Sequence, residues 1–87
     1  MSTAERMRER LAALAPQSVD IADESAKHAG HAGAKGGGGH YALTIVAKKF
    51  DGQSTVARHR MIYGALGDLM QREIHALSIR AFAPGEL

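Results

Sequence analysis

Hydrophobic positions along this chain follow two different periods, and the changes of period divide it into segments of predicted helix and strand. The first apolar positions have helical spacing: Met7, Leu11 and Leu14. Ser2 with Glu5 three residues later forms the capping-box pattern that begins a helix. We therefore predict a first helix after Ser2, ended by Pro16.

Three later segments alternate apolar and polar residues with a period of two, which is typical of strands with one buried face. Val19 and Ile21 lie in the first, and the second is a β-rich run around Tyr41 to Val46 that stops at Asp51-Gly52. The third runs from His75 to Phe82, with Leu77 and Ile79 in one phase. We predict that the second is the central strand.

The spacing returns to that of a helix between the second and third strands. Ser54 can cap this helix, and its apolar stripe is Ile62, Leu66, Leu69 and Met70. Asp68 and Arg72 are placed to pair at i and i+4. Gly64 and Gly67 each weaken the helix by roughly 1 kcal/mol relative to alanine, which suggests close packing against a neighbour or a break near its first turns.

The element order is helix, strand, strand, helix, strand. Two strands on either side of a long helix favour a right-handed βαβ unit, with the first strand added antiparallel at an edge. We expect an α+β two-layer sandwich: a three-stranded mixed sheet with helices on one face. Residues 26–39, rich in glycine, alanine and histidine and ending in Gly36 to Gly39, are predicted to form a flexible loop.

Composition limits what such a chain can do. At 87 residues we expect a single domain, 1–87, without a large enclosed active site. Its net charge of +2 does not by itself indicate nucleic acid. The absence of cysteine excludes a disulfide, a thiolate nucleophile and a metal site built from its own sulfurs. No stretch is long enough to span a bilayer and no signal-peptide pattern is present, so we expect no membrane partner and a location in the cytoplasm.

The five histidines are the candidate donors of chemistry. His59 shares the apolar stripe of the second helix, where the ordinary interpretation is a histidine at the edge of the core. His75 is in phase with Leu77 and sits where a strand begins. His40 has the opposite phase to the buried positions of its strand and should face away from them or lie at the edge. His28 and His31 lie in the glycine-rich loop; solvated side chains are the ordinary interpretation, and a zinc site with an acidic residue is an alternative.

Basic residues gather in a small group: Lys48, Lys49, Arg58 and Arg60. Such a group can contact phosphates or can equally be a solvated surface. The glycine run lacks the Gly-Lys-Ser/Thr ending of a phosphate loop and leads into a strand. We find no pattern of a catalytic site, so we expect neither an enzyme nor a small-molecule substrate.

Several segments together resemble the BolA family: Asp23-Glu24-Ser25, Lys27-His28, Phe50-Asp51-Gly52-Gln53-Ser54, Arg58-His59-Arg60-Met61-Ile62-Tyr63 with Leu66, Ile74-His75-Ala76-Leu77-Ser78-Ile79, and Pro84. The resemblance extends from about Val19 to Glu86, and the two long segments are specific in combination. The family commonly carries polar residues before the histidine that begins the second strand, whereas this chain has four glycines there.

The resemblance implies a KH-like fold of class II type and a monothiol glutaredoxin as partner, with a [2Fe-2S] cluster shared by the two proteins and glutathione. It implies that His75 is a cluster ligand and that His28 is a second, with His31 as a substitute. The isolated chain is then expected to hold no cluster. It also implies an alternative function, a transcriptional regulator that binds nucleic acid weakly, for which the basic group Lys48, Lys49, Arg58 and Arg60 would supply the phosphate contacts. The predicted elements include no Gly-x-x-Gly turn between two helices of the kind with which KH domains clamp a backbone, because Gly64 and Gly67 fall inside the predicted second helix.

Overall fold

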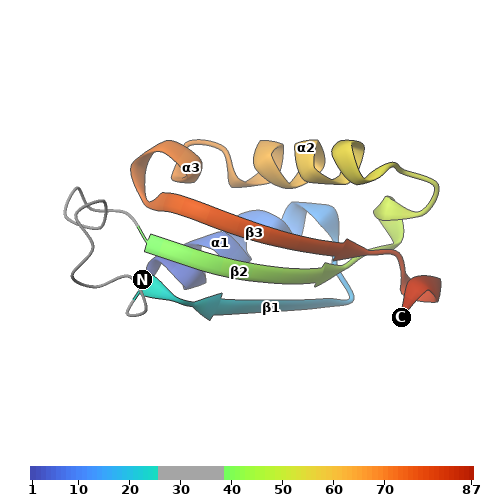
Figure 1. The fold of residues 1–87 in the computed structure, drawn as a ribbon, viewed down its shortest axis with the longest axis horizontal. Coiled ribbons are helices and arrows are strands. Elements are labelled where there is room, and N and C mark those ends of the chain that lie inside the picture. The colour runs from blue at the N-terminus through green and yellow to red at the C-terminus, as the bar shows by residue number, and fades with distance from the viewer. Residues whose placement is uncertain (26–38) are drawn as a thin grey trace.

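The computed structural model describes residues 1–25 and 39–87, and their elements follow the predicted order (Figure 1). In chain order the elements are α1 (Thr3–Leu11), η1 (Ala12–Leu14), β1 (Ser18–Asp23), β2 (Gly39–Val46), η4 (Lys48–Phe50), α2 (Thr55–Leu66), α3 (Leu69–Arg72), β3 (Ile74–Phe82) and η5 (Pro84–Glu86), the η elements being short 3₁₀ turns. Gly39, which we had assigned to the loop, begins β2 instead.

The three strands form one mixed sheet in the order β1-β2-β3. β1 pairs antiparallel with β2, and β2 pairs parallel with β3. Along β2, buried Tyr41, Leu43 and Ile45 alternate with half-buried residues, because the helices cover only one face of the sheet (Figure 1). The predicted α+β architecture, with a central second strand and an antiparallel edge strand, is confirmed.

The first helix begins as the capping box predicts. The Ser2 hydroxyl accepts a hydrogen bond from the Glu5 N–H at 3.1 Å, and the Glu5 carboxylate accepts one from the Ser2 N–H at 2.9 Å. The α-helix ends at Leu11 and continues as one tight turn to Leu14; Ala15 then adopts a left-handed conformation with φ of 50° before Pro16. Its apolar stripe is buried, with Met7 and Leu11 at 0% exposure.

The prediction of one helix through Met70 is wrong. The helix ends at Gly67, which adopts a φ of +57° that L side chains rarely tolerate, and a separate short helix α3 follows. The break therefore lies at the last turn of α2 and not near its first. A Cβ on Gly64 would meet no atom within 4 Å, so close packing does not explain that glycine. Asp68 pairs with Arg72 at 3.3 Å, as predicted, and with Arg10 of α1 at 2.9 Å.

One core lies between the helices and the sheet. Its fully buried large side chains come from every layer: Met7, Leu11, Leu43, Ile45, Phe50, Ile62 and Leu66. Phe50 lies in the short turn η4 between β2 and α2, and its burial holds that connection against the core. Burying side chains of this size stabilises the fold by about 1.5–3 kcal/mol each before the entropy cost is subtracted.

An ion pair anchors the chain end to α2 at the side of the molecule where β3 ends. The Arg58 guanidinium donates to both carboxylate oxygens of Glu86, at 2.6 and 2.8 Å, and to the Ala81 carbonyl at 3.0 Å. Glu86 also accepts from the Ala83 N–H at 2.9 Å. These bonds favour the ionised carboxylate and lower the pKa of Glu86 from 4.5 to about 2, with the Arg58 hydrogen bond as the largest cause.

A pH-dependent contribution to stability follows from this pair. Because the folded-state pKa of Glu86 is depressed, its contribution is complete above pH 4.5 and is lost as pH falls from about 4.5 to about 2. We expect Glu86→Gln to lower the free energy of unfolding at pH 7, with the difference from wild type vanishing near pH 2. Urea unfolding at pH 7, 4 and 2 measures this, and Glu9→Gln, an exposed carboxylate on α1, is the control. A loss for Glu86→Gln that is equal at all three pH values would contradict it.

Candidate functional site

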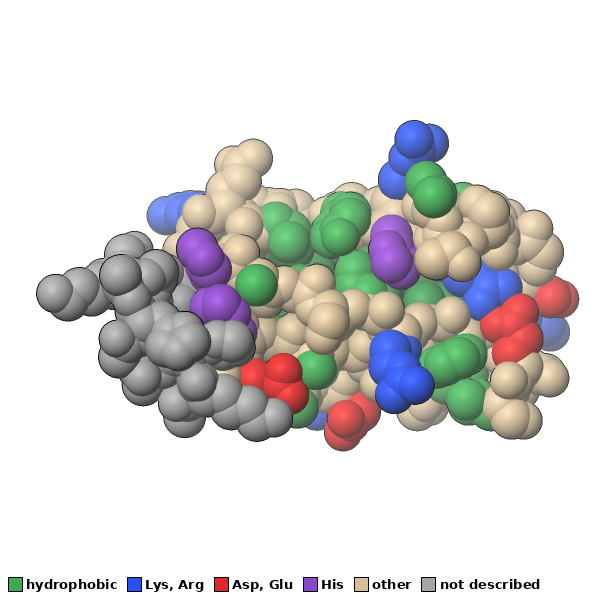
Figure 2. All heavy atoms as spheres, viewed as in Figure 1, with side chains coloured by type: hydrophobic (Ala, Val, Ile, Leu, Met, Phe, Trp, Pro, Cys, Tyr) green, Lys and Arg blue, Asp and Glu red, His purple; other side chains and the backbone are tan. Residues whose placement is uncertain are grey.

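Two histidines lie side by side where β2 and β3 begin. His40 is the second residue of β2 and His75 is the second residue of β3. Because the two strands run parallel, their amino ends meet at the same end of the sheet. The two ring centroids are 5.0 Å apart with an angle of 41° between the ring planes. Histidine side chains gather at this end of the molecule in the space-filling view (Figure 2).

A register shift between the two strands produces this arrangement. Gly39 is opposite Ile74, but His40 is opposite Ala76, so His75 is the extra residue on β3. Simple alternation had placed His75 on the same face as Leu77. The extra residue breaks that alternation at the strand's start, so Ile74 is buried, at 5% exposure, and His75 is exposed.

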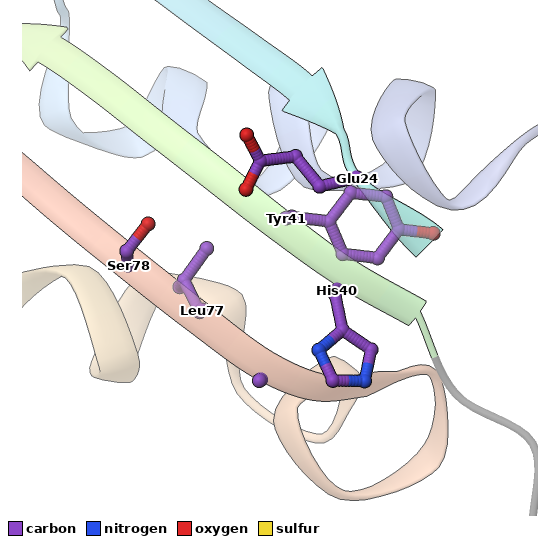
Figure 3. Close-up of a pocket in the computed structure, with 6 residues that line it drawn as sticks. Glu24, His40, Tyr41, Leu77 and Ser78 are labelled. Atoms are coloured by element: carbon purple, nitrogen blue, oxygen red, sulfur yellow. The ribbon is translucent and has the colours of Figure 1, made fainter. Parts of the chain in front are cut away.

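His40 faces away from the helices, as its phase predicted. It is half-buried and pairs with Ala76, while the next residue, Tyr41, turns into the core. An open depression of about 260 Å³ lies beside it, lined by Glu24, His40, Tyr41, Ala76, Leu77 and Ser78. Figure 3 shows the imidazole of His40 over the start of β3 and the carboxylate of Glu24 over β2. The small side chains of Ala76 and Ser78 leave room for a ligand or partner on this face.

The residue immediately before His40, Gly39, is packed closely under the ring of Tyr41. A Cβ on Gly39 would lie 2.5 Å from Cε2 and 2.6 Å from the hydroxyl oxygen of Tyr41. Both distances are far below van der Waals contact, so the tyrosine ring occupies the space that any other side chain at residue 39 would take. Gly39, the last of the four glycines, therefore has a packing role that could not be predicted from the glycine-rich segment in which it lies.

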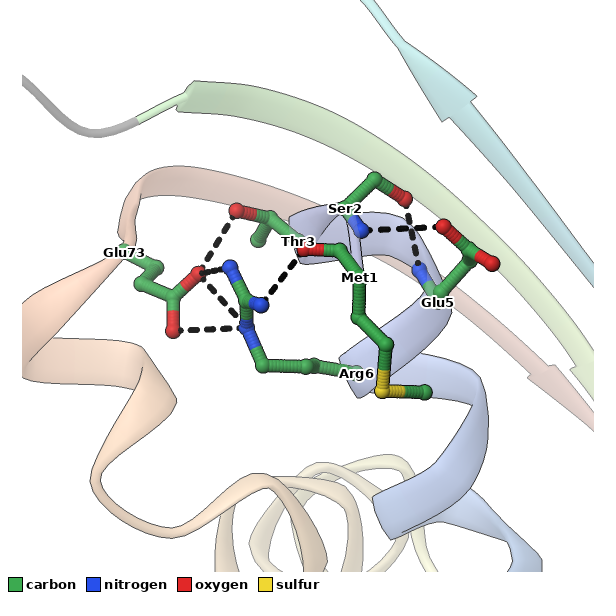
Figure 4. A network of polar contacts seen from close by, with 6 residues as sticks. All are labelled: Met1, Ser2, Thr3, Glu5, Arg6 and Glu73. Carbon is green, nitrogen blue, oxygen red and sulfur yellow. Dashed lines mark hydrogen bonds and ion pairs between the residues drawn. The ribbon is translucent and has the colours of Figure 1, made fainter.

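A polar network attaches the start of β3 to the first helix (Figure 4). Glu73 directly precedes β3 and accepts hydrogen bonds from the Thr3 hydroxyl at 2.8 Å and from Nε of Arg6 at 3.0 Å. The Glu73 carbonyl accepts the Gly39 N–H at 3.0 Å, which begins the pairing of β2 with β3. The hydrogen bond from Arg6 is the largest cause of a lowered pKa at Glu73, followed by that from Thr3. The carboxylate is therefore ionised at neutral pH.

Of the other histidines, the structure describes only His59, which is not part of the pair. His28 and His31 lie outside the described residues. His59 is half-buried on α2, with its ring 6.4 Å from that of Tyr63 in an edge-to-face arrangement. Within residues 1–25 and 39–87, no group of three or more His, Asp or Glu side chains is placed to hold a metal ion. In the same residues no helix has the length and apolar character that a membrane span requires.

The four predicted basic residues differ in their surroundings. Lys48, Lys49 and Arg60 are exposed. The guanidinium of Arg58 is bound to Glu86, and its side chain is only 11% exposed. Lysine and arginine side chains lie apart from one another on the face that Figure 2 shows.

Comparison with known proteins agrees with this fold. The family model described as BolA-like protein matches residues 11–86. The chain belongs to the BolA family. It is 44% identical to the chloroplastic Protein BOLA1 of Arabidopsis thaliana over 95% of this chain and 54% of that protein, so it spans about half the length of this BolA relative. It is 34% identical to the DNA-binding transcriptional regulator BolA of Escherichia coli over 94% of this chain and 76% of that protein.

Solved BolA structures have the same fold. The BolA domain of SufE1 from Arabidopsis thaliana superposes with a TM-score of 0.85 at 41% identity, covering 100% of this chain and 98% of that one. The predicted family and fold class are thus confirmed.

His40 is the member of the histidine pair to which the sequence assigned no role. Its phase, pointing away from the core, was the only available signal. The register shift that brings His75 beside it is not visible in the sequence.

The packing of Tyr41 over Gly39 predicts opposite effects for two identical substitutions. Gly39→Ala forces the ring away and should lower the free energy of unfolding by about 1–3 kcal/mol, as overpacking does. Gly64→Ala, in open space on α2, should raise it by about 1 kcal/mol through helix propensity alone. Denaturant unfolding measures both, and ring-proton NMR of Tyr41 should change only in the first variant. A Gly39→Ala protein as stable as wild type, with unchanged Tyr41 resonances, would contradict this packing.

Proposed function

We propose that this BolA protein is a non-enzymatic partner of a monothiol glutaredoxin and that it supplies histidine ligation to a [2Fe-2S] cluster shared by the two proteins. The observation that carries the proposal is the exposure of His75 at the start of β3, in the family segment that the sequence matches. An exposed imidazole on a hydrogen-bonded strand is held in place by its backbone yet open to a second protein.

The metal-binding side chains of this chain are those expected if the cluster is shared with a second protein. Clusters of this type are held mostly by cysteine thiolates, with histidine replacing cysteine at some positions. This chain has no cysteine, so it can contribute imidazole only. The described residues also hold no group of three or more candidate ligands. The sulfur donors therefore have to come from the partner and from glutathione, and the isolated chain should not assemble the cluster.

The residue expected to act beside His75 is His28, with His31 as a substitute. Both lie outside the described residues, and their roles stay predictions. When bound, the cluster would supply a redox centre whose potential is raised by replacing a negatively charged thiolate with neutral imidazole. Because a protonated imidazole cannot bind a metal, the chain's contribution should weaken in acid. Cluster trafficking or iron regulation in the cytoplasm is the role we propose.

Removal of the imidazole at residue 75 tests the proposal. We expect the purified chain, mixed with a monothiol glutaredoxin, iron, sulfide and glutathione, to give a coloured heterodimer whose visible absorption and circular dichroism differ from those of glutaredoxin alone. His75→Ala should abolish that difference, because the exposed side chain is a ligand and not a packing element.

His59→Ala is the matched control, since it removes an imidazole from α2 that lies outside the pair. It should leave the spectra unchanged. A His75→Ala protein that gave wild-type spectra while remaining folded by far-ultraviolet circular dichroism would rule out the assignment.

The alternative is a transcriptional regulator that binds nucleic acid. It is favoured by the similarity to the DNA-binding transcriptional regulator BolA of Escherichia coli and by the exposure of Lys48, Lys49 and Arg60. Arg58 contributes less to such an interface, because its guanidinium is already bound to Glu86. Of the four basic residues, Lys48, Lys49 and Arg60 would therefore make most of the phosphate contacts.

The dependence of affinity on salt tests the alternative. If three cations contact phosphates of single-stranded DNA, replacing Lys48, Lys49 and Arg60 together by alanine should reduce the slope of log K against log[salt] by about 2, or roughly 0.7 for each contact. Fluorescence anisotropy with a labelled oligonucleotide measures it, and Arg8→Ala on α1 is the control. Absence of binding by the wild-type chain at low salt would eliminate this function.

A further inference from the structure

We propose that His40 and His75 together form a site for a single divalent transition-metal ion, of the Zn²⁺ or Co²⁺ class, in the chain without its partner. The inference goes beyond the proposed function: it shares His75 with it, but it requires neither a cluster nor a glutaredoxin.

The separation of the rings agrees with joint binding of one ion. A zinc-bound imidazole nitrogen lies about 2.0–2.1 Å from the metal, and a ring centre lies roughly 1.1 Å beyond its nitrogen, so two imidazoles on one tetrahedral ion have centres roughly 5 Å apart. The centroids of His40 and His75 are 5.0 Å apart. Joint binding then requires that the rings turn so that one nitrogen of each aims at the same point.

The backbone holds both residues in place before an ion arrives. His40 and Ala76 are paired in the parallel ladder, and the Gly39 N–H is bonded to the Glu73 carbonyl just before the two histidines. Arg6 and Thr3 hold the side chain of Glu73 at the same point. A pair of donors whose backbone is fixed in this way loses little backbone conformational entropy on binding, which favours affinity.

Among the described residues, the surroundings of the two histidines leave space for the other coordination positions. His75 is exposed, and the depression beside His40 opens on the face without helices. Water or a partner's ligands can complete the coordination, as in sites that keep open positions. Imidazole nitrogen suits zinc, copper, nickel and iron and does not suit magnesium or calcium.

An aromatic contact is the competing explanation, because ring pairs that merely pack have centroids about 4.5–7 Å apart. A packing contact does not depend on metal. The two explanations therefore differ in whether the isolated chain takes up a metal ion through these two residues.

Isothermal titration calorimetry of the isolated chain with Zn²⁺ alone distinguishes the metal site from the packing contact. We expect one ion per chain, with His40→Ala and His75→Ala each weakening binding by about tenfold or more, and the double variant binding no better than the weaker single variant. His40→Gln replaces His40→Ala if the alanine variant is not folded. Co²⁺ absorption in the visible region should lose intensity in the same variants.

Two controls locate the site. His59→Ala should keep wild-type affinity, and so should a variant with both His28→Ala and His31→Ala, which removes the two remaining histidines. Wild-type affinity in His40→Ala or its glutamine substitute, loss confined to the His28 and His31 variant, or no uptake by the wild-type chain at millimolar Zn²⁺ would each overturn the proposal.

The outcome is independent of the cluster experiment. If zinc uptake depends on His40 and His75 but no cluster forms with glutaredoxin, only the proposed function fails. If the cluster forms and zinc uptake does not involve His40, only the divalent site fails.

Discussion

The parallel pairing of β2 with β3, and the one extra residue that β3 carries at its start, determine what this end of the molecule presents to its surroundings. In a regular parallel ladder, side chains alternate between faces, and His75 would follow Leu77 toward the helices. The shift between Gly39 and His40 leaves His75 without a cross-strand partner, exposed and beside His40. Bulges are rare in parallel pairs and frequent beside functional sites, where they re-aim a side chain. The candidate site is therefore produced by a backbone irregularity and not by a cavity enclosed in the core.

Several contacts hold that irregularity in place, and they come from distant parts of the chain. Tyr41 lies over Gly39, and the carboxylate of Glu73 accepts hydrogen bonds from Thr3 and Arg6 of the first helix. At the other end of β3, Arg58 and Glu86 attach the chain end to α2. Both ends of the strand are therefore anchored by charged hydrogen bonds, while its middle is held by the ladder with β2. This arrangement suits a protein that presents a side chain to a partner from a rigid scaffold.

Under the proposed function, the donor chemistry of this chain requires a second molecule. Imidazole is the only strong transition-metal donor that the chain possesses besides carboxylate, because it has no cysteine. Two neutral imidazoles can bind one divalent ion with water in the remaining positions, but a [2Fe-2S] cluster needs thiolates that this chain cannot supply. A mononuclear ion and a shared cluster would use the same His75. Occupation by one excludes the other, so metal availability and partner concentration would compete at a single residue.

The sequence alone determined the architecture and the family. Periodicity, the Ser2 and Glu5 capping box and the element order predicted the helices, the three strands and the antiparallel edge, because these depend on local spacing and on general rules of connection. It also placed Phe50 to Ser54 and the long motifs around His59 and His75 in a recognisable family pattern.

Only the tertiary structure decided the rest. Local spacing carries no information on which residues of two strands stand opposite each other, so the register shift, the approach of His40 to His75 and the packing of Tyr41 over Gly39 were not predictable. The same limit explains the engagement of Arg58 by Glu86, which is 28 residues away in the chain. The division of the predicted second helix has a local cause instead, the positive φ of Gly67. Contacts between distant segments form only when the core brings them together, and they decide which of the predicted donors and cations are free to act.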